Sequence, residues 1–177
     1  MNKKRILSIF MALCVIAGLV LGAQTEVSAK TKKTVKVTFN GKSITLDTDR
    51  GQKARKEPKT LSAVENKLGK KSRMATDDDG VYGNAYVWEK GKTTIAISED
   101  EANNGLGGIS ITIKDKNGSI DGLKVGMTKA KAVKKLKNAY GSTHVQVSKN
   151  SIYVDNTVMF GIELKNGKVS EITWFRS

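Results

Sequence analysis

Apolar and polar residues alternate along two short stretches near residue 40, and a strong turn signal lies between them. Thr34–Phe39 and Lys42–Leu46 each follow a period of two, which is typical of a β-strand with one buried face. Asn40-Gly41 joins the two stretches, and these residue types tolerate the positive φ angles of a two-residue type I′ turn. The pattern therefore predicts a β-hairpin over residues 34–46.

A short amphipathic helix followed by three strands is predicted over residues 60–116. The apolar residues of the helix recur at the spacing that places them on one face: Leu61, Val64 and Leu68. Ser62 and Glu65 have the spacing of a capping box, and Gly69 can end the helix. The strands are expected at Val81–Glu89, Thr93–Ser98 and Gly108–Lys114. Their short connections predict an antiparallel meander.

The same order of elements recurs over residues 117–177. Thr128 is the expected N-cap of a helix over Lys129–Tyr140, and Gly141 is its expected end. The strands that follow are expected at Val145–Val147, Ser151–Val154, Thr157–Leu164 and Val169–Phe175. The predicted fold class is α+β, with two tandem helix-plus-antiparallel-meander units after an N-terminal β-hairpin.

A spacing of 72 residues relates the two halves. Val64-x-x-x-Leu68-Gly69 matches Leu136-x-x-x-Tyr140-Gly141, and the same spacing relates Tyr86-Val87-Trp88 to Val158-Met159-Phe160. A short helix on three strands is marginal alone, so two such units would pair to bury a common face. Either an internal duplication or two unrelated α+β halves would account for the pattern.

The second unit opens with Gly126-Met127-Thr128 and a helix that carries Val133 and Leu136. This opening resembles that of small exported domains, which include the beta-lactamase inhibitory proteins and the outer-membrane assembly lipoproteins. Over residues 120–175 the resemblance implies a helical layer on an antiparallel sheet, and a protein that binds macromolecules and catalyses nothing. The chain departs from both families, because residues 30–177 contain no cysteine for disulfides and Cys14 does not satisfy a lipobox.

The N-terminus has the organisation of a signal peptide over residues 1–29. Lys3, Lys4 and Arg5 precede an apolar run, and Val27-Ser28-Ala29 supplies a small-residue cleavage site. The alternative is an uncleaved membrane anchor, since the run of 18 residues is at the lower limit for a membrane span. We expect a secreted or cell-wall-associated bacterial protein of Gram-positive type.

The composition and the motifs of the exported chain limit the functions that it can have. Removing residues 1–29 takes three basic residues and one acidic residue from totals of 31 and 17, which leaves 28 and 16. Residues 30–59 are expected to be a basic stem, the hairpin and a linker that contains the only proline, Pro58. No Ser-x-x-Lys, Gly-x-Ser-x-Gly or His-Glu-x-x-His motif occurs, so the sequence predicts no enzyme and no cofactor.

Two features could still carry chemistry, and each has a simpler interpretation. His144 could act as a general base, but a surface or edge histidine near a strand start is the interpretation that the sequence favours. The acidic clusters Asp77–Asp79 and Glu99–Glu101 could hold Ca²⁺, but neither follows the EF-hand pattern and both lie at expected turns. No metal site is predicted.

Lysines gather on one face of the second predicted helix. At 3.6 residues per turn Lys131, Lys134 and Lys135 stand together, beside the apolar stripe that contains Leu136. They are candidate ligands for an anionic cell-wall polymer or another envelope polyanion, or they form a solvated helix face. Nucleic acid is disfavoured because no helix-turn-helix, zinc or RNP motif occurs, and a membrane contact is expected only if the signal segment stays uncleaved.

Aromatic residues suggest a second surface. Tyr82, Tyr86 and Trp88 have equal parity on one expected strand, and Trp174 lies on the last strand. On an exposed sheet face they would form a protein-binding patch; between sheet and helices they would fill the core. The sequence thus predicts a non-catalytic protein-binding module, such as an inhibitor or accessory of an exported protein, with a charge-driven polyanion binder as the alternative.

Overall fold

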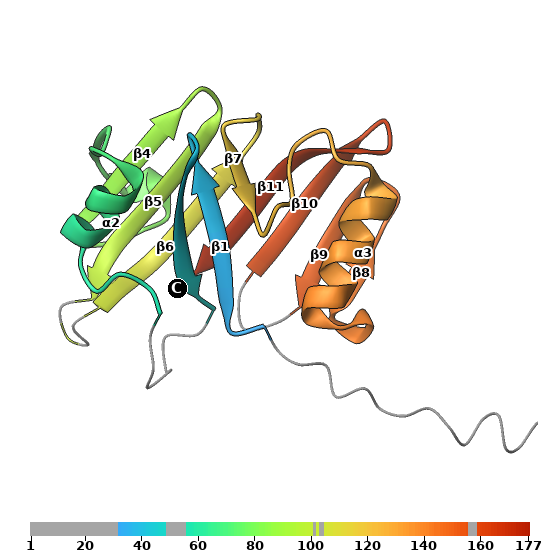
Figure 1. Cartoon of the computed structure of the whole chain (residues 1–177), viewed down its shortest axis with the longest axis horizontal. Coiled ribbons are helices and arrows are strands. Elements are labelled where there is room, and N and C mark those ends of the chain that lie inside the picture. The colour runs from blue at the N-terminus through green and yellow to red at the C-terminus, as the bar shows by residue number, and fades with distance from the viewer. Residues whose placement is uncertain (1–31, 49–55, 101, 103–104, 156–158) are drawn as a thin grey trace, which may run out of the picture.

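The computed structural model describes residues 32–48, 56–100, 102, 105–155 and 159–177 (Figure 1). The elements in chain order are β1 (Thr34–Phe39), β2 (Lys42–Asp47), α2 (Leu61–Leu68), β3 (Arg73–Met74), η1 (Asp77–Asp79), β4 (Ala85–Lys90), β5 (Thr93–Asp100), β6 (Gly105–Ile113), β7 (Gly118–Ile120), α3 (Lys129–Tyr140), η2 (Ser142–His144), β8 (Val145–Val147), β9 (Ser151–Asp155), β10 (Met159–Lys165) and β11 (Lys168–Arg176). The predicted signal segment, residues 1–29, lies outside the described residues.

The strands form two antiparallel sheets, which confirms the α+β class. The larger sheet has eight strands in the order β3-β4-β5-β6-β11-β10-β9-β8, and the smaller has three in the order β2-β1-β7. At the centre of the larger sheet β6 pairs with β11, with Ile113 opposite Ile172 and Ile111 opposite Trp174. The two predicted meanders therefore join edge to edge in one continuous sheet.

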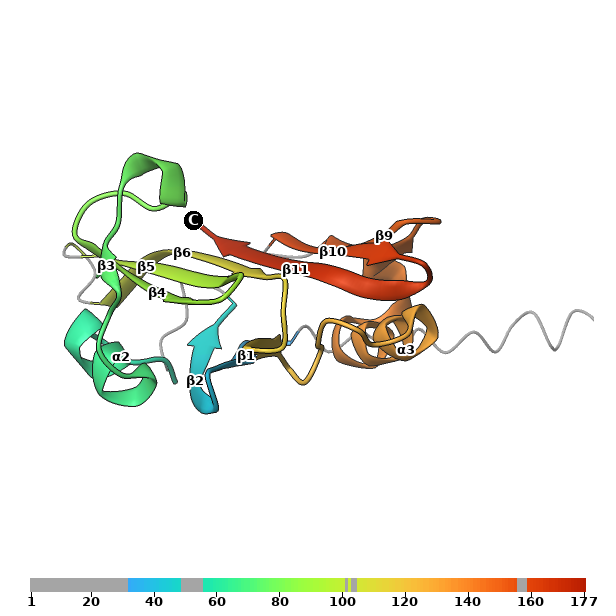
Figure 2. The same cartoon turned by 90° about the horizontal axis from the view of Figure 1, so that it is seen from above.

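One face of the eight-stranded sheet is covered and holds the main hydrophobic core. Figure 2 shows α2, the three-stranded sheet and α3 in a row on this side of the sheet. The core between these layers contains Trp88, Tyr140, Phe160 and Trp174, each at most 1 % exposed. Tyr140 and Phe160 meet edge to face with ring centroids 5.9 Å apart.

The N-terminal hairpin is present as predicted, with a third strand that the sequence did not indicate. Asn40 and Gly41 have φ angles of 47° and 79° at the turn. The short strand β7 pairs with β1, with Val37 opposite Ile120. Gly118 of β7 has no room for a side chain, because an added Cβ would lie 2.9 Å from Thr93 Cγ2. The hairpin is thereby fixed across the middle of the larger sheet.

Each half of the eight-stranded sheet consists of one helix followed by four consecutive antiparallel strands, α2 with β3–β6 and α3 with β8–β11. The 72-residue spacing relates the helix ends, Gly69 and Gly141, and the first strand residues, Arg73 and Val145. It fails at the next strand, because β4 corresponds in order to β9, whereas the predicted match for Tyr86-Val87-Trp88 falls at β10. A longer connection before β4 causes the shift. Common descent of the halves stays a prediction.

The helices lie where the sequence predicts, but their caps differ. Thr60, not Ser62, caps α2, since its side chain accepts a hydrogen bond from Ala63 N at 3.2 Å. Glu65, the expected partner of Ser62, accepts instead from Lys71 N. Thr128 stands at the N-cap position of α3 but makes no side-chain capping bond. Both helices end at a glycine of positive φ, as predicted.

The expected linker is fastened to the body at both ends, while its middle, residues 49–55, lies outside the described residues. Arg176 Nη1 of β11 lies 2.6 Å from Glu57 Oε2, and both side chains are almost fully buried. The Arg176 guanidinium also donates to the carbonyls of Asp47, Leu106 and Gly107. Asp47 in turn accepts from Lys56 N through both carboxylate oxygens. This buried network joins the hairpin, the linker and the last strand.

Candidate binding face

The two tryptophans predicted for partner binding are part of the core. Trp88 and Trp174 are each 1 % exposed. Trp88 points under α2, where its Nε1 donates to Gly69 O at 2.7 Å. Their parity places both on the covered face, so in this structure they are not accessible to a partner. The interpretation of these rings as core residues is the one that the structure supports.

Tyr86 and Tyr82 are separated from each other. Tyr86 is partly buried on the covered face, with its ring 6.1 Å from that of Trp88 and with Lys71 Nζ 3.8 Å above its centroid. Tyr82 lies outside any strand, because β4 begins at Ala85 and not at Val81 as predicted. Gly80 and Gly83 have φ angles of 70° and 80°. These left-handed residues turn the chain into a loop, and Tyr82 in it is 79 % exposed.

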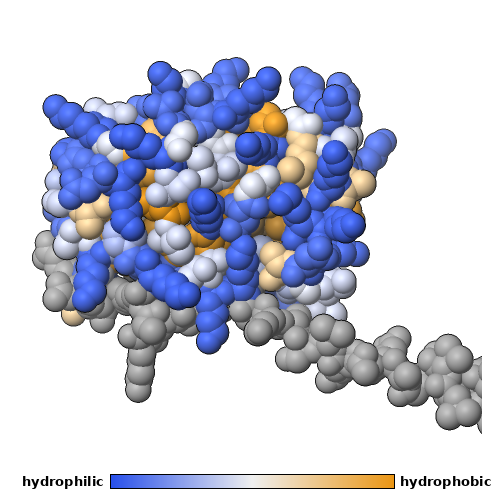
Figure 3. Space-filling model, viewed as in Figure 1, coloured by the Kyte–Doolittle hydropathy of each residue, from blue (hydrophilic) through white to orange (hydrophobic). Residues whose placement is uncertain are grey.

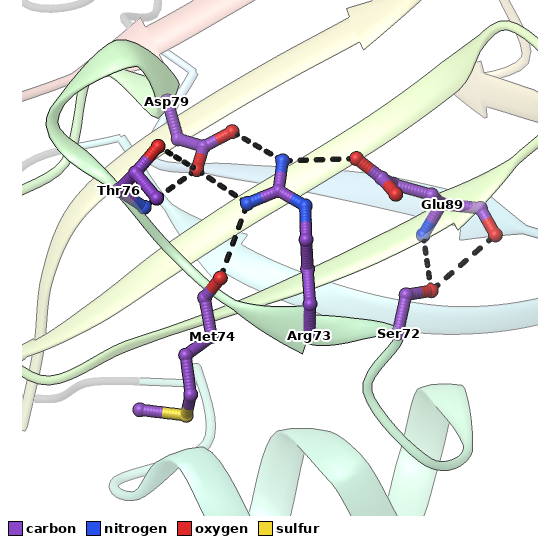
Figure 4. Close-up of polar contacts among 6 residues, drawn as sticks. All are labelled: Ser72, Arg73, Met74, Thr76, Asp79 and Glu89. Carbon is purple, nitrogen blue, oxygen red and sulfur yellow. Dashed lines mark hydrogen bonds and ion pairs between the residues drawn. The ribbon is translucent and has the colours of Figure 1, made fainter.

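The loop over residues 75–84 stands on the other face of the sheet, opposite the helices (Figure 2). Its connection to β3 is held by a clamp of charged side chains (Figure 4). Arg73 donates two hydrogen bonds to the Asp79 carboxylate, at 2.7 and 2.8 Å, and a third to Glu89 at 3.0 Å. Asp79 also accepts from the backbone and hydroxyl of Thr76. Asp79 of the predicted acidic cluster thus has a structural role.

The clamp shifts the pKa values of both Asp79 and Arg73. The Arg73 hydrogen bonds lower the pKa of Asp79 to about 2, with a further contribution from Thr76 N–H. The carboxylates of Asp79 and Glu89 raise the pKa of Arg73 above its ordinary value. The Asp79 carboxylate and the Arg73 guanidinium therefore both stay charged throughout the neutral and mildly acidic pH range. Loss of the clamp is expected only as the pH falls toward 2.

The rest of this face is bare sheet, which we call the open face. Its side chains come from β6, β11, β10 and β9 and point away from the helices, as strand alternation requires. They are Ser110, Thr112, Lys168, Glu171, Thr173, Phe175, Met159, Gly161, Glu163, Lys165, Ser151, Tyr153 and Asp155. Met159 is 56 % and Tyr153 is 41 % exposed. Sequence reasoning missed this surface, because the aromatic residues it singled out lie elsewhere.

The centre of the open face is shallow, and apolar side chains stand around it. Tyr153 lies opposite Gly161 on β10, which lies opposite Thr173 on β11, so only small side chains follow the tyrosine along that row. In the neighbouring row Met159 lies opposite Phe175. A Cβ at Gly161 would lie 2.9 Å from Thr173 Oγ1, so a larger residue here would force the threonine side chain to move.

The open face carries charges of both signs, with Lys165 opposite Lys168 at one end of the β10–β11 pair, whereas the whole chain carries a formal net charge of +14. Its acidic residues are Asp155, Glu163 and Glu171, and Glu163 lies directly opposite Glu171 across the strand pair. Lys114 neutralises Glu171, with its Nζ 3.1 Å from the carboxylate. Two like charges in direct cross-strand register repel each other. This arrangement favours a cationic group near Glu163.

A hollow of about 610 Å³, which we call the loop pocket, lies between the loop and the sheet. Tyr82 and the loop residues around it form one wall, and Phe175 and Gly108 of the sheet contribute to the other. Glu99 and Asp100 at the end of β5 also line it. Val81, which is 3 % exposed, fixes the base of the loop in a small second cluster with Ala85, Val87 and Ala96. The loop pocket continues the open face at Phe175.

The three lysines singled out on the second helix are exposed, on α3, on the side opposite the open face. Figure 3 views that side and shows hydrophilic side chains standing over most of it. Within the described part of the chain, Lys131, Lys134 and Lys135 form no ion pair. Ala132, Leu136 and Tyr140 of the same helix are buried. The structure therefore brings the lysines together on the surface, as the helical spacing predicts.

The remaining candidates for chemistry are dispersed. His144 Nδ1 lies 2.9 Å from the backbone oxygen of Asp155 at the sheet edge. Among the described residues there is no group of three side chains suited to hold a metal ion. Glu99 accepts hydrogen bonds from Leu61 N and Asn84 Nδ2. In the same part of the chain, no helix is long and apolar enough to cross a membrane.

Comparisons with family models, with curated proteins and with solved structures found no match to the chain.

Proposed function

We propose that this protein is a non-catalytic binding module that holds a protein partner on its open face. The observation that carries the proposal is the asymmetry of the large sheet, because α2, the three-stranded sheet and α3 cover one face and only the loop stands on the other. Antiparallel sheets tolerate one solvated face, but that face is then typically polar. Here Tyr153, Met159 and Phe175 are exposed or partly exposed among the polar side chains of that face.

The shape of the open face suits a protein surface. Tyrosine, phenylalanine and methionine are enriched where proteins contact one another, because each buries a large apolar area. The small side chains between them, Gly161 and Thr173, leave the strand backbone approachable. The partner would present a convex surface to this rigid sheet.

The charge of the open face indicates the chemistry of the partner. Asp155 and Glu163 would face basic side chains of the partner, which would offset the repulsion between Glu163 and Glu171. The predicted signal segment supports a partner outside the cytoplasm, in the envelope or the secreted fraction. Inhibition of an exported enzyme is one form that such binding would take, and it rests on the resemblance alone.

A second candidate function is attachment to an anionic cell-wall polymer through α3. It is favoured by the exposed lysines of this helix, which have no acidic partner among the described residues. Lysine suits diffuse attraction to a polyanion more than the bidentate recognition that arginine provides. The two candidates use opposite sides of the molecule, so variants can separate them.

The test is capture of binding partners by residues 30–177, which include all of the described fold, from envelope and supernatant fractions. We expect a discrete protein to be retained from low to about 0.5 M salt, since an apolar contact is weakly screened. Met159→Lys should weaken its retention at least about tenfold, because it places a charge among the apolar side chains of the contact. The matched variant Lys131→Glu/Lys134→Glu/Lys135→Glu should retain it.

The opposite pattern would contradict the proposal. If only wall polymer is retained, and if salt and the triple charge reversal abolish that retention while Met159→Lys does not, the polyanion candidate is correct. A captured protein whose retention is unchanged by Met159→Lys would place its binding site elsewhere.

A further inference from the structure

A second hollow, which we call the helix pocket, is lined by residues of α3, of the turn after β7 and of the chain just before β1. Its volume is about 300 Å³, at the lower end of the range for small-ligand sites. It lies on the covered side of the large sheet, where α3 stands beside the three-stranded sheet (Figure 2). The lining residues are Lys32, Asp121, Leu123, Lys135, Leu136, Asn138, Ala139 and Tyr140.

The Tyr140 hydroxyl is a buried donor without a partner. The side chain is 1 % exposed, its ring packs edge to face against Phe160, and its hydroxyl oxygen forms no hydrogen bond. Burial raises the pKa of Tyr140, and the nearby negative charge of Asp121 raises it further, so the hydroxyl keeps its proton. A buried donor that is left unsatisfied costs free energy. An acceptor group bound in the helix pocket would remove that cost.

Two ammonium groups line the same pocket, and only one of them has a carboxylate partner. Lys32 Nζ lies 2.6 Å from Asp121 Oδ2, and Asp121 Oδ1 accepts a hydrogen bond from Lys36 N. Both oxygens of that carboxylate are therefore occupied. The Lys135 ammonium approaches the same turn, because a Cβ added at Gly122 would lie 3.5 Å from its Nζ. Lys135 forms no ion pair within the described chain, so the pocket carries one positive charge in excess.

We infer that the helix pocket binds a phosphate group. Its oxygens would accept from the Tyr140 hydroxyl and from the Lys135 ammonium, while Lys32 keeps the Asp121 carboxylate neutralised. A phosphate suits this set because it offers acceptor oxygens in several directions, whereas a carboxylate offers two in one plane. A cation would meet the uncompensated charge of Lys135.

This inference goes beyond the proposed function and does not rest on it, because the helix pocket and the open face lie on different sides of the large sheet. It would give the second candidate function a defined site. A polymer with phosphodiester links would place one phosphate in the helix pocket, and the other lysines of α3 would attract its neighbouring charges.

The test is a titration of ¹⁵N-labelled protein with sodium phosphate, at an ionic strength held constant with sodium chloride. We expect the amide signals of residues 121–123 and 135–140 to shift with a dissociation constant of about 1–10 mM, because a few charge-assisted hydrogen bonds form in a small pocket. Sodium acetate, titrated in the same way, should bind at least about threefold more weakly.

Three variants test the roles of the lining residues. Tyr140→Phe removes only the hydroxyl and should weaken phosphate binding by about tenfold. In phosphate-free buffer the urea midpoint of this variant should be no lower than that of the wild type, because the lost hydroxyl has no partner. Lys135→Gln should weaken binding by about three- to tenfold. Lys131→Gln removes an equal charge from α3 outside the pocket, and it should leave the dissociation constant unchanged within about twofold.

Three results would overturn the inference. Equal weakening by Lys131→Gln and Lys135→Gln would mean that the net charge of the helix attracts phosphate without a site. Wild-type affinity of Tyr140→Phe would mean that the hydroxyl does not contact the ligand. A clearly lower urea midpoint of Tyr140→Phe without phosphate would mean that the hydroxyl already has a partner inside the protein.

A second ligand identifies the source of the phosphate group. Dimethyl phosphate is a diester, like the links of a polymer, and carries a single negative charge. Binding within about threefold of inorganic phosphate would support the site and indicate a phosphodiester polymer. Much weaker binding of the diester, with inorganic phosphate still bound in the pocket, would support the site and indicate free phosphate or a phosphate monoester.

Discussion

Replacing Arg176 with methionine is expected to lower the free energy of unfolding by about 3–5 kcal/mol, which urea unfolding followed by circular dichroism would measure. Arg176 is 3 % and Glu57 is 6 % exposed, and their ion pair is 2.6 Å long. Removing the guanidinium leaves a buried carboxylate without its counter-charge. It also leaves the carbonyls of Leu106 and Gly107 without their donor.

The double variant Glu57→Leu/Arg176→Met is the control for this result. It should be more stable than Arg176→Met alone, because no unpaired charge remains in the interior. A loss of less than about 1 kcal/mol in the single variant would mean that the guanidinium and Glu57 are solvated, and that the linker is not fastened to the last strand.

Trp88→Ala is expected to lower the free energy of unfolding by about 3–5 kcal/mol, again measured by urea unfolding. The indole is 1 % exposed in the core beneath α2, and its Nε1 donates to Gly69 O, the residue that ends that helix. The variant therefore loses packing and leaves the carbonyl of Gly69 without its donor. Its effect on binding would follow from unfolding rather than from a lost contact.

Tyr82→Ala provides the contrast within the same part of the chain. The side chain is 79 % exposed, so its removal should change the stability by no more than about 0.5 kcal/mol. If Tyr82→Ala were as destabilising as Trp88→Ala, the Tyr82 side chain would be packed against the body of the protein and not exposed at the surface.

Local signals in the sequence determine much of the fold. The Asn40-Gly41 turn, the apolar face of α2 and the terminating Gly69 and Gly141 each act through a few neighbouring residues. All of these elements were predictable for that reason. The loop before β4 was not predictable. Val81 and Tyr82 are residue types that favour strands, so they look like the start of β4. Only the φ angles at Gly80 and Gly83 place them outside it.

The site itself depends on long-range placement, which alternation along a strand does not define. Parity puts Tyr86 and Trp88 on one face, but it does not say which face the helices cover. The structure shows that this face is the covered one, which leaves Tyr153 and Met159 on the other. The Arg176–Glu57 pair joins residues that are 119 positions apart, and no spacing rule connects them.

The two sides of the molecule suggest how a basic protein could select a basic partner. The lysines of α3 lie on one side, and the open face, where Asp155, Glu163 and Glu171 stand near its apolar side chains, lies on the other. Like-charge repulsion on the helical side would disfavour approach of the partner there, while the open face attracts it. The net charge of +14 is therefore a poor guide to the ligand of the open face.

The most direct measurement is oxidative footprinting of the protein, alone and with its captured partner bound, read by mass spectrometry. Met159 and Tyr153 are the reporters of the open face, at 56 % and 41 % exposure, and Met74, at 48 % exposure on β3, is the internal control. We expect the partner to lower oxidation of Met159 and Tyr153 several-fold and to leave oxidation of Met74 unchanged. Unchanged oxidation of Met159 and Tyr153 in the complex would contradict it.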